Sequence, residues 1–267
     1  LGHTLLSDAA HLAERVGHTV VNEPDRVALT DRETVARSLD GIEGCVVPRT
    51  WRCTREALIR HAGEPVDAPA YAGALTMPYP LLVRPAGTHG GLNFHKVRDA
   101  RHLDTVLRQT DASHYYTTQY VDYRSADGYF RKYRFIFVGD EVLPYHLAVG
   151  DVWKVHHATT SMIDHPWMQH EEQAFLDNPC QVFNAEQCAA LDAIRARIGL
   201  DYFGIDCGLD RSGRVVVFEV NACMLVHGHN AAFPYKAQAV NRIRLAFHAM
   251  LRQKALHARR EMPAARD

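Results

Sequence analysis

The sequence predicts an α+β fold, because two β-hairpins stand among helices without a regular strand–helix–strand repeat. Residues 129–138 and 141–148 are rich in β-forming side chains and flank Gly139-Asp140, a dipeptide typical of a tight turn. Residues 203–209 and 214–220 form a second pair around a four-residue turn. Hairpins with helices beside them therefore favour α+β over a doubly wound parallel sheet.

The other elements follow from local patterns. Residues 3–16 carry apolar side chains at helical spacing, and Gly17 stops the pattern. A second helix is predicted with Thr30 or Asp31 as its N-cap. Further helices are expected at residues 54–61, 99–108, 168–177, 185–198 and 235–257, and further strands at 18–22, 45–47, 80–85, 92–97 and 114–121.

Composition shifts divide the chain into three regions. Residues 62–80 are rich in Ala, Gly and Pro and are interpreted as a linker. We expect a truncated small α/β region over 1–65, a first lobe with a glycine-rich loop over 66–122, and a second lobe with a candidate metal site and a C-terminal helix over 123–267.

The totals exclude several classes of protein. The 30 basic and 31 acidic side chains nearly cancel, so charge gives no argument for nucleic acid or membrane. No apolar run approaches the roughly 20 residues that span a bilayer, and no secretion leader is recognised. The six cysteines form no CxxC pair and are expected to be reduced thiols of a cytoplasmic protein. The chain starts at Leu1 rather than Met, which allows for an upstream domain.

The strongest chemical signal is a candidate metal site on the second hairpin. Glu219 and Asn221 lie two residues apart on one strand and share a face, and a four-residue turn can bring Asp206 beside them. Two carboxylates and an amide oxygen suit Mg²⁺, which prefers oxygen ligands and shares its shell with phosphates. The alternative is that Glu219 is a solvent-facing charge on an edge strand.

A glycine-rich loop follows the strand that ends at Arg84. Glycines in Ala86–Gly91 expose backbone N–H groups, so Gly87, Gly90 and Gly91 can lie over a polyphosphate while Arg84 contacts an oxygen. A plain hairpin turn is the alternative interpretation.

Two further stretches complete a candidate nucleotide site. Gln119, Tyr120 and Val121 leave a strand, where exposed backbone can pair with an adenine edge, and the nearby Asp127 can hold a ribose. An ordinary strand exit is the alternative here.

Cations follow on residues 129–134. Lys132 and Arg134 share one strand face, which suits a phosphate or a developing oxyanion, and Lys154 is a further phosphate candidate. A cationic sheet edge is the alternative.

Together these residues resemble the ATP-grasp superfamily over about Val20–Leu251. In that family a strand ending in Lys or Arg precedes a glycine-rich flap, as in Pro80–Gly91, and an adenine hinge matches Gln119–Asp122. The family's metal signature, an Asp followed by Glu-x-Asn, matches Asp206 and Glu219–Asn221. Asp31-Arg32 looks like the family's Asp-Lys, which makes Arg32 a nucleotide contact. Arg32 and Arg84 stand where the family has lysines, which keeps the positive charge.

The resemblance implies two lobes with antiparallel sheets that clasp Mg-ATP, and an ATP-dependent carboxylate–amine ligase as the activity. ATP would convert a small-molecule or peptide carboxylate into an acyl phosphate, which an amine then attacks, with Arg134 stabilising the oxyanion. More narrowly, DGYFRKYR and LDYFGIDC resemble the ATP-grasp domain at the C-terminus of bacterial tetratricopeptide-repeat proteins, which implies an upstream repeat domain.

The segment after the metal signature is the expected border of the acceptor pocket. It is apolar at Met224–Val226 and turns polar at His227, a candidate proton acceptor. The alternative is that this segment packs under the last helix and His227 caps a turn.

Two competing functions remain at the level of sequence. One keeps the fold but makes the chain a phosphotransferase or a non-catalytic ATP-binding module of a repeat protein. The other is a zinc protein using His156-His157, His227, His229, Cys207 and Cys223, although their spacing matches no zinc pattern.

Overall fold

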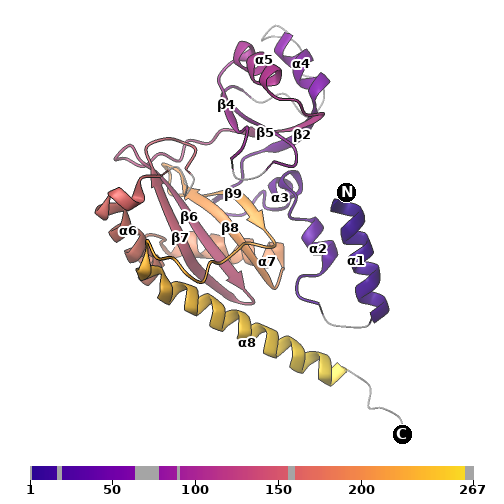
Figure 1. The fold of residues 1–267 in the computed structure, drawn as a ribbon, viewed down its shortest axis with the longest axis vertical. Coiled ribbons are helices and arrows are strands. Elements are labelled where there is room, and N and C mark those ends of the chain that lie inside the picture. The colour runs from indigo at the N-terminus through magenta and orange to yellow at the C-terminus, as the bar shows by residue number, and fades with distance from the viewer. Residues whose placement is uncertain (1, 17–19, 64–77, 89–90, 156–159, 262–267) are drawn as a thin grey trace.

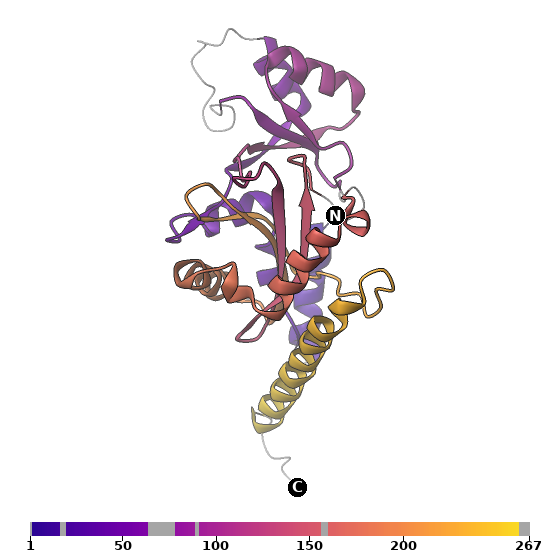
Figure 2. The same ribbon diagram turned by 90° about the vertical axis from the view of Figure 1, so that its left-hand side faces the viewer.

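The computed structural model describes residues 2–16, 20–63, 78–88, 91–155 and 160–261, and they form two β-sheets with helices packed around each (Figures 1 and 2). The smaller sheet and two helices make one lobe at the top of Figure 1, and the larger sheet and most of the helices lie below it. This mixed architecture with largely antiparallel sheets confirms the predicted α+β class.

The larger sheet has five strands in the order β1-β9-β8-β6-β7. Its two predicted hairpins are confirmed, since β6 pairs antiparallel with β7 and β8 pairs antiparallel with β9. The strands are β1 (Cys45–Val46), β6 (Phe130–Val138), β7 (Glu141–Gly150), β8 (Tyr202–Leu209) and β9 (Val215–Asn221).

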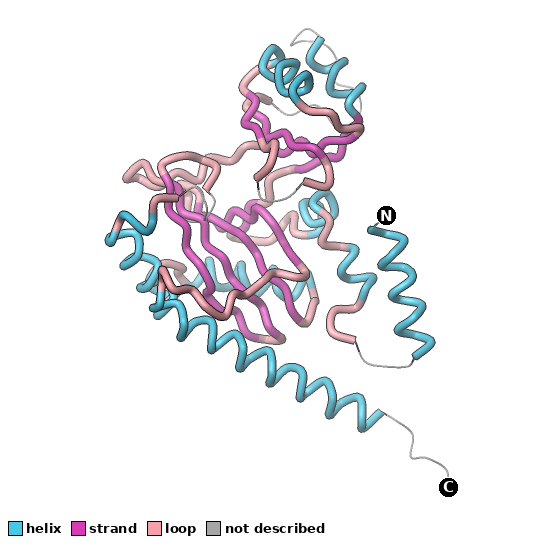
Figure 3. The backbone as a smooth tube through the Cα atoms, viewed as in Figure 1, coloured by secondary structure: helices cyan, strands magenta, loops and turns pink. Residues whose placement is uncertain are grey.

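Helices cover one face of this sheet fully and the other in part. On one face, Phe135 of β6 packs against Phe175 of α6 (Pro166–Asp177) and shares a core with Ile194 of α7 (Ala185–Ile198). On the opposite face Ile136 belongs to a core shared with α8 (Ala237–Glu261). Figure 3 shows α8 running along the lower end of the sheet, so the upper end of this second face is left for other contacts.

The smaller sheet has four strands in the order β2-β5-β3-β4, and α4 (Arg55–Gly63) and α5 (Ala100–Gln109) pack on it. Its core includes Leu58, Val83, Leu103 and Tyr115, none of them exposed. The strands are β2 (Thr50–Thr54), β3 (Leu81–Pro85), β4 (His95–Val97) and β5 (His114–Gln119). No strand was predicted at Thr50–Thr54.

The N-terminal region differs from the prediction in two ways. Val20–Asn22, the described part of the strand predicted over 18–22, is not a strand, because Asn22 has a φ of 59° and breaks the extended run. The unpredicted helix α2 (Pro24–Ala28) follows, with Pro24 at its first position. The predicted helices at 3–16 and after Asp31 are confirmed as α1 (Gly2–Val16) and α3 (Arg32–Ser38).

The strands of residues 1–65 join both sheets. β1 pairs parallel with β9 of the larger sheet, and β2 pairs antiparallel with β5 of the smaller one. Asp31 caps α3, which lies between them, by accepting hydrogen bonds from the backbone of Glu33 and Thr34. The region predicted as a separate α/β unit thus contributes to both sheets. In the described part of the chain, no helix is both long enough and apolar enough to cross a bilayer.

Candidate functional site

A cleft of about 460 Å³ lies between the two sheets, within the range of small-molecule sites. Both sheets line it, and so do α3 and the segment after β9. It brings together twelve of the predicted site residues: Arg32, Arg84, Gly91, Gln119, Tyr120, Val121, Arg134, Lys154, Asp206, Glu219, Asn221 and His227.

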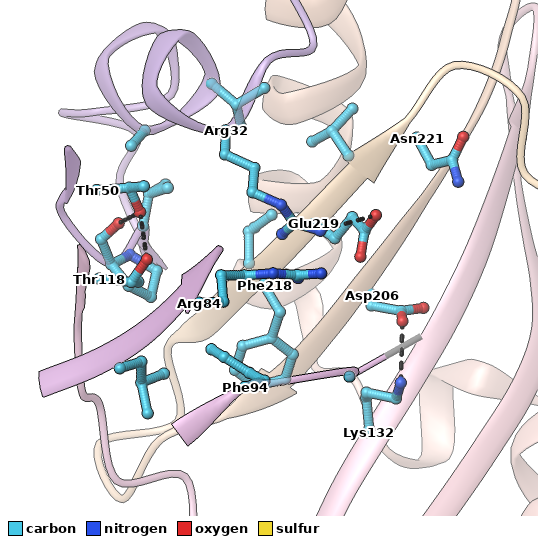
Figure 4. Close-up of a pocket in the computed structure, with 18 of the residues that line it drawn as sticks. Arg32, Thr50, Arg84, Phe94, Thr118, Lys132, Asp206, Phe218, Glu219 and Asn221 are labelled. Atoms are coloured by element: carbon cyan, nitrogen blue, oxygen red, sulfur yellow. Dashed lines mark hydrogen bonds and ion pairs between the residues drawn. The ribbon is translucent and has the colours of Figure 1, made fainter. Parts of the chain in front are cut away.

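The predicted metal ligands meet on one face of the larger sheet. Asp206 lies directly opposite Glu219 in the β8–β9 pairing, and Asn221 lies opposite Gly204. Opposed residues of an antiparallel pair point to the same side, so the two carboxylates and the amide face the cleft together (Figure 4). The hairpin therefore brings Asp206, Glu219 and Asn221 together on one face, as their spacing in the sequence predicted.

Cations hold both carboxylates. Asp206 accepts hydrogen bonds from Nζ of Lys132 at 3.0 Å and from Nε and Nη2 of Arg134 at 2.6 and 3.0 Å. Glu219 pairs with Arg32 at 3.1 Å (Figure 4). Burial alone would raise the pKa of Asp206, but Lys132 and Arg134 hold it well below its usual range, so this carboxyl stays ionised.

Register places these groups in a row across the strands. Arg134 on β6 lies opposite Asp206 on β8, which lies opposite Glu219 on β9. Two residues further along β6, Ile136 lies on the same face and is covered by the α8 core. This face therefore carries apolar side chains where α8 covers it and ionisable side chains where it borders the cleft.

The donor set fits a magnesium ion. It consists of two ionisable carboxylates and the amide oxygen of Asn221, which accepts one hydrogen bond, from the backbone of Cys223 at 2.8 Å, and keeps a second lone pair. For zinc, no group of three His, Cys, Asp or Glu side chains within the described ranges is placed to hold a metal. His156 and His157 lie outside those ranges.

The smaller sheet supplies a further cation to the cleft. Arg84 is 7% exposed, and its guanidinium bonds to the side-chain and backbone oxygens of Thr88 in the loop and lies 5.4 Å from the ring centre of Phe94. Burial, and then the neighbouring charge of Arg32, lower the pKa of Arg84 to about 10, so the group remains protonated at neutral pH. Two guanidinium groups thus face the cleft side by side (Figure 4).

Gly91, at the end of the glycine-rich loop, contacts the larger lobe. Lys154 donates from Nζ to the carbonyl of Gly91 at 3.4 Å, and Gly91 has a φ of 74°, which suits glycine. Gly87 also has a positive φ, of 81°, but does not line the cleft. The predicted contact at Gly90 lies outside the described residues.

Phe94, Tyr120 and Trp153 are among the aromatic residues that line the cleft, and the sequence motifs pointed only to Tyr120. Trp153 packs edge-on against Phe94 at 5.2 Å and against Tyr120 at 6.4 Å. Rings from three separate elements converge there, so no local pattern marks them. They give the region beside Gln119 and Val121 an apolar lining suited to a planar base.

Asp127 lies apart from the cleft. Its carboxylate makes a two-bond ion pair with Arg131, at 2.8 and 2.9 Å, and Arg131 also pairs with Glu171 on α6. Asp127 does not line the cleft, so the structure gives the predicted ribose contact no support from geometry.

The segment after β9 borders the cleft as predicted. Met224 packs where Gly204 leaves room, since a Cβ on Gly204 would lie 2.6 Å from a Met224 side-chain atom. Leu225 is 67% exposed and His227 is exposed, and both line the cleft. The backbone N–H of His227 donates to the hydroxyl of Tyr145 at 2.9 Å, which holds the segment on β7.

No protein-family model matches the chain, and no curated protein matches it. Solved structures do match. The chain is similar to VanG D-Ala:D-Ser ligase from Enterococcus faecalis, with a TM-score of 0.52, 15% identity, and coverage of 90% of this chain and 68% of that one. It is equally similar to D-alanine–D-alanine ligase from Bacillus anthracis, with a TM-score of 0.52, 14% identity, and coverage of 94% and 75%.

A third similar structure is the ATP-grasp ligase PsnB complexed with the precursor peptide PsnA2 and AMPPNP, with a TM-score of 0.50, 16% identity, and coverage of 94% and 67%. The arrangement of two sheets around a cleft is thus that of ATP-dependent ligases. The chain has the ATP-grasp fold, as its sequence motifs predicted.

Proposed function

We propose that the chain is an ATP-dependent carboxylate–amine ligase that binds Mg-ATP in the cleft. The observation that carries this proposal is the row of Glu219, Asp206 and Arg134 on three adjacent strands, open to a cleft whose other wall carries Arg84. An ATP-dependent ligase needs metal ligands and phosphate-binding cations close together, and this row supplies both.

Each part of the nucleotide has a candidate partner. Asp206, Glu219 and Asn221 would hold Mg²⁺, which when bound neutralises charge on the transferred phosphoryl group. Arg32, Arg84 and Lys154 surround the place for the phosphates. Gln119, Tyr120 and Val121 offer strand-end backbone to adenine, and Phe94 and Trp153 offer apolar faces.

The chemistry follows from these positions. A substrate carboxylate oxygen takes the γ-phosphoryl group of ATP, which releases ADP and leaves an acyl phosphate. An amine then attacks the acyl carbon, the carbon–oxygen bond to phosphate breaks, and phosphate leaves as the amide forms. Arg134 would stabilise the oxyanion of that step, and His227, which lines the cleft, would take the amine's proton.

Substrate and setting extend the proposal. VanG and the Bacillus anthracis enzyme are named for small amino-acid substrates, and PsnB was solved with a peptide, so we include small-molecule and peptide carboxylates and amines. We place the protein in the cytoplasm, where ATP is supplied and the described cysteines, all free, stay reduced. An upstream tetratricopeptide-repeat domain in a longer chain is the proposed partner.

A matrix assay tests the activity. The protein with Mg-ATP is incubated with a panel of amino acids and short peptides, singly and in pairs, and ADP and phosphate are measured together with product mass. A ligase releases both ADP and phosphate only when carboxylate and amine are present. ADP without free phosphate, with a phosphorylated hydroxyl compound, identifies a phosphotransferase. Nucleotide binding without turnover across the panel identifies a binding module.

A further inference from the structure

The row of ionisable side chains continues past Arg134 to the outermost strand. His146 on β7 lies directly opposite Arg134, and beyond it stands Glu172 of α6, which is completely buried. Neither residue lines the cleft. Arg134 therefore lies between two buried carboxylates, Asp206 on the neighbouring strand β8 and Glu172 of α6 beyond β7.

Glu172 is held by donors from two elements. The backbone N–H of Leu147 donates to it at 3.1 Å, Tyr235 donates from its hydroxyl at 2.7 Å, and Lys236 donates from Nζ at 2.8 Å. His146 also contacts it through Nδ1. Burial alone would raise the pKa of Glu172, but His146 and Lys236 lower it to about 2, so a full negative charge sits beneath the sheet edge.

A β-bulge brings this cluster together. Arg134 pairs with His146 and Phe135 pairs with Pro144, which leaves Tyr145 as the extra residue. Consecutive residues of a regular strand point to opposite faces, yet Tyr145 and His146 both reach Lys236. The Nζ of Lys236 is 2.8 Å from Nδ1 of His146 and 5.7 Å from the centre of the Tyr145 ring. The bulge re-aims one side chain, as bulges beside functional sites do.

The charge of Arg134 acts on the residues of this cluster. Burial lowers the pKa of both Lys236 and His146, and the guanidinium of Arg134 lowers each further. An unpaired buried carboxylate attracts the nearest cation strongly, because the interior screens charge poorly. If Glu172 lacked its own ammonium group, two groups would remain to balance it: His146, which contacts it directly, and Arg134, which lies opposite His146 and could turn toward it only at the expense of Asp206.

We propose that Lys236 is a positioning residue for Arg134: it neutralises buried Glu172, so that Arg134 stays beside Asp206 at the cleft. The catalytic consequence rests on the proposed ligase function, whereas the position of Arg134 does not. The proposal predicts that charge balance, and not the presence of either side chain, decides where Arg134 lies.

Arginine side-chain NMR on the full chain without ligands measures that position. The Arg134 Nε–H signal is assigned by its loss in Arg134→Lys, and its bond to Asp206 Oδ1 should protect it from solvent exchange. In Lys236→Met the signal should shift and exchange at least severalfold faster. In the double variant Lys236→Met/Glu172→Gln it should return toward the wild-type position, since both charges are gone.

Two controls separate charge from packing. Tyr235→Phe removes one donor to Glu172 without changing charge, and should leave the Arg134 signal in place. Lys236→Arg keeps the charge, and remains informative if Lys236→Met folds poorly. If Lys236→Met leaves the Arg134 signal unchanged, or if the double variant is displaced as far as the single one, the proposal is overturned.

Metal binding gives an independent readout. Arg134 competes with a cation for Asp206, so Lys236→Met should bind Mn²⁺ alone about three- to tenfold more tightly, and the double variant should return to the wild-type affinity. Electron paramagnetic resonance of free Mn²⁺ measures this without nucleotide. These shifts would support the inference even if no ligase substrate were found. Ligase activity with an unmoved Arg134 signal in Lys236→Met would overturn the inference alone.

Discussion

Asp206 and Glu172 are two buried carboxylates at the same sheet with opposite access to the cleft. Asp206 is 5% exposed and Glu172 is not exposed at all, and each pairs with a lysine at nearly the same distance, 3.0 and 2.8 Å. Asp206 lines the cleft together with both of its cations, whereas the Glu172 cluster does not. The two carboxylates have similar distances to their lysines and are both ionised, so they differ in whether a ligand in the cleft can reach them.

The ion pairs at Asp206 can be exchanged for a ligand, whereas those at Glu172 are permanent. A metal ion entering the cleft can replace Lys132 and Arg134 at Asp206, and the two released cations can pair with a polyphosphate, because all three side chains face the same space. A ligand that enters the cleft does not meet Glu172, because neither Glu172 nor its partners line the cleft, so these ion pairs are fixed by folding. Substitutions at the first cluster should therefore change ligand binding and rate, and those at the second should change stability and the position of Arg134.

The largest expected effect is at the metal site. Glu219→Ala should reduce Mg-ATP turnover to background while the fold stays intact, because this carboxylate is a proposed metal ligand that packs little of the core. Turnover and circular dichroism measure the two effects. Asp104→Ala, which breaks an exposed pair on α5, is the control and should change neither. Normal ATP turnover in Glu219→Ala would show that the metal assignment is wrong.

Arg134 and Arg84 should respond in opposite ways. Arg134→Met should lower turnover by about 10²–10³ with nucleotide affinity nearly unchanged, since it loses a donor to a developing oxyanion. Arg84→Ala should mainly weaken nucleotide binding, since Arg84 is the proposed phosphate contact on the smaller sheet. Calorimetry with Mg-AMPPNP and turnover at saturating ATP separate the two. If Arg134→Met weakened nucleotide binding but kept normal turnover, Arg134 would be a binding residue and its assigned role in the rate would be wrong.

His227 tests whether the exposed end of the cleft performs proton transfer. A base must be deprotonated to act, so turnover should fall at acidic pH in the wild type. His227→Gln should bind ATP normally, lower coupled turnover by about 10²-fold or more, and lose that acidic limb. A pH–rate profile measures this. An unchanged profile with a lower melting temperature would leave His227 with only its structural contact to Tyr145.

The Asp206 and Glu172 clusters also differ in how well the sequence predicted them. Asp206, Glu219 and Asn221 lie on one hairpin, so period-two alternation and a short turn were enough to bring them together. The partners of Glu172 lie 25 to 64 residues away along the chain. A glutamate within a helix is usually on the surface, so no local pattern marked this one as buried.

Local sequence patterns carry no information on contacts between distant segments, which also explains the other differences between prediction and structure. Strands β1 and β2 are only four residues apart in sequence yet join different sheets, which local propensity does not encode. Asp127 was assigned to a ribose because it is acidic and near the hinge, but Arg131 holds it elsewhere. The aromatic lining by Phe94 and Trp153 likewise depends on the closed arrangement of the two lobes.

Glu172→Gln should cost stability rather than nucleotide binding. It leaves buried Lys236 without its counter-charge, so the free energy of unfolding at neutral pH should fall by about 3–5 kcal/mol, and by less in the double variant with Lys236→Met. The folded pKa of Glu172, about 2, lies below its ordinary value of 4.5. Its stabilisation is therefore present above pH 4.5 and is lost as pH falls from 4.5 toward 2.

Urea unfolding across this pH window measures the effect. The wild type should lose stability steeply as pH falls, and Glu172→Gln should show a flatter profile. Asp206 also has a lowered pKa and contributes in the same direction, so the slope should decrease without vanishing. An unaltered slope would mean that Glu172 is not the ionised, buried group described above.

The smallest expected effect comes from a third lysine–carboxylate pair, which isolates burial as the variable. Lys254 on α8 and Asp201 lie 2.8 Å apart, the same distance as Lys236 and Glu172, but both side chains are about a quarter exposed. Solvent screens such a pair and hydrates either partner when the other is removed. Lys254→Met should therefore lower the free energy of unfolding by only about 0.5–1 kcal/mol, less so at high salt. Urea unfolding at two salt concentrations measures this beside Lys236→Met. Equal losses in the two variants would contradict the argument that burial, and not pair geometry, sets what an ion pair contributes here.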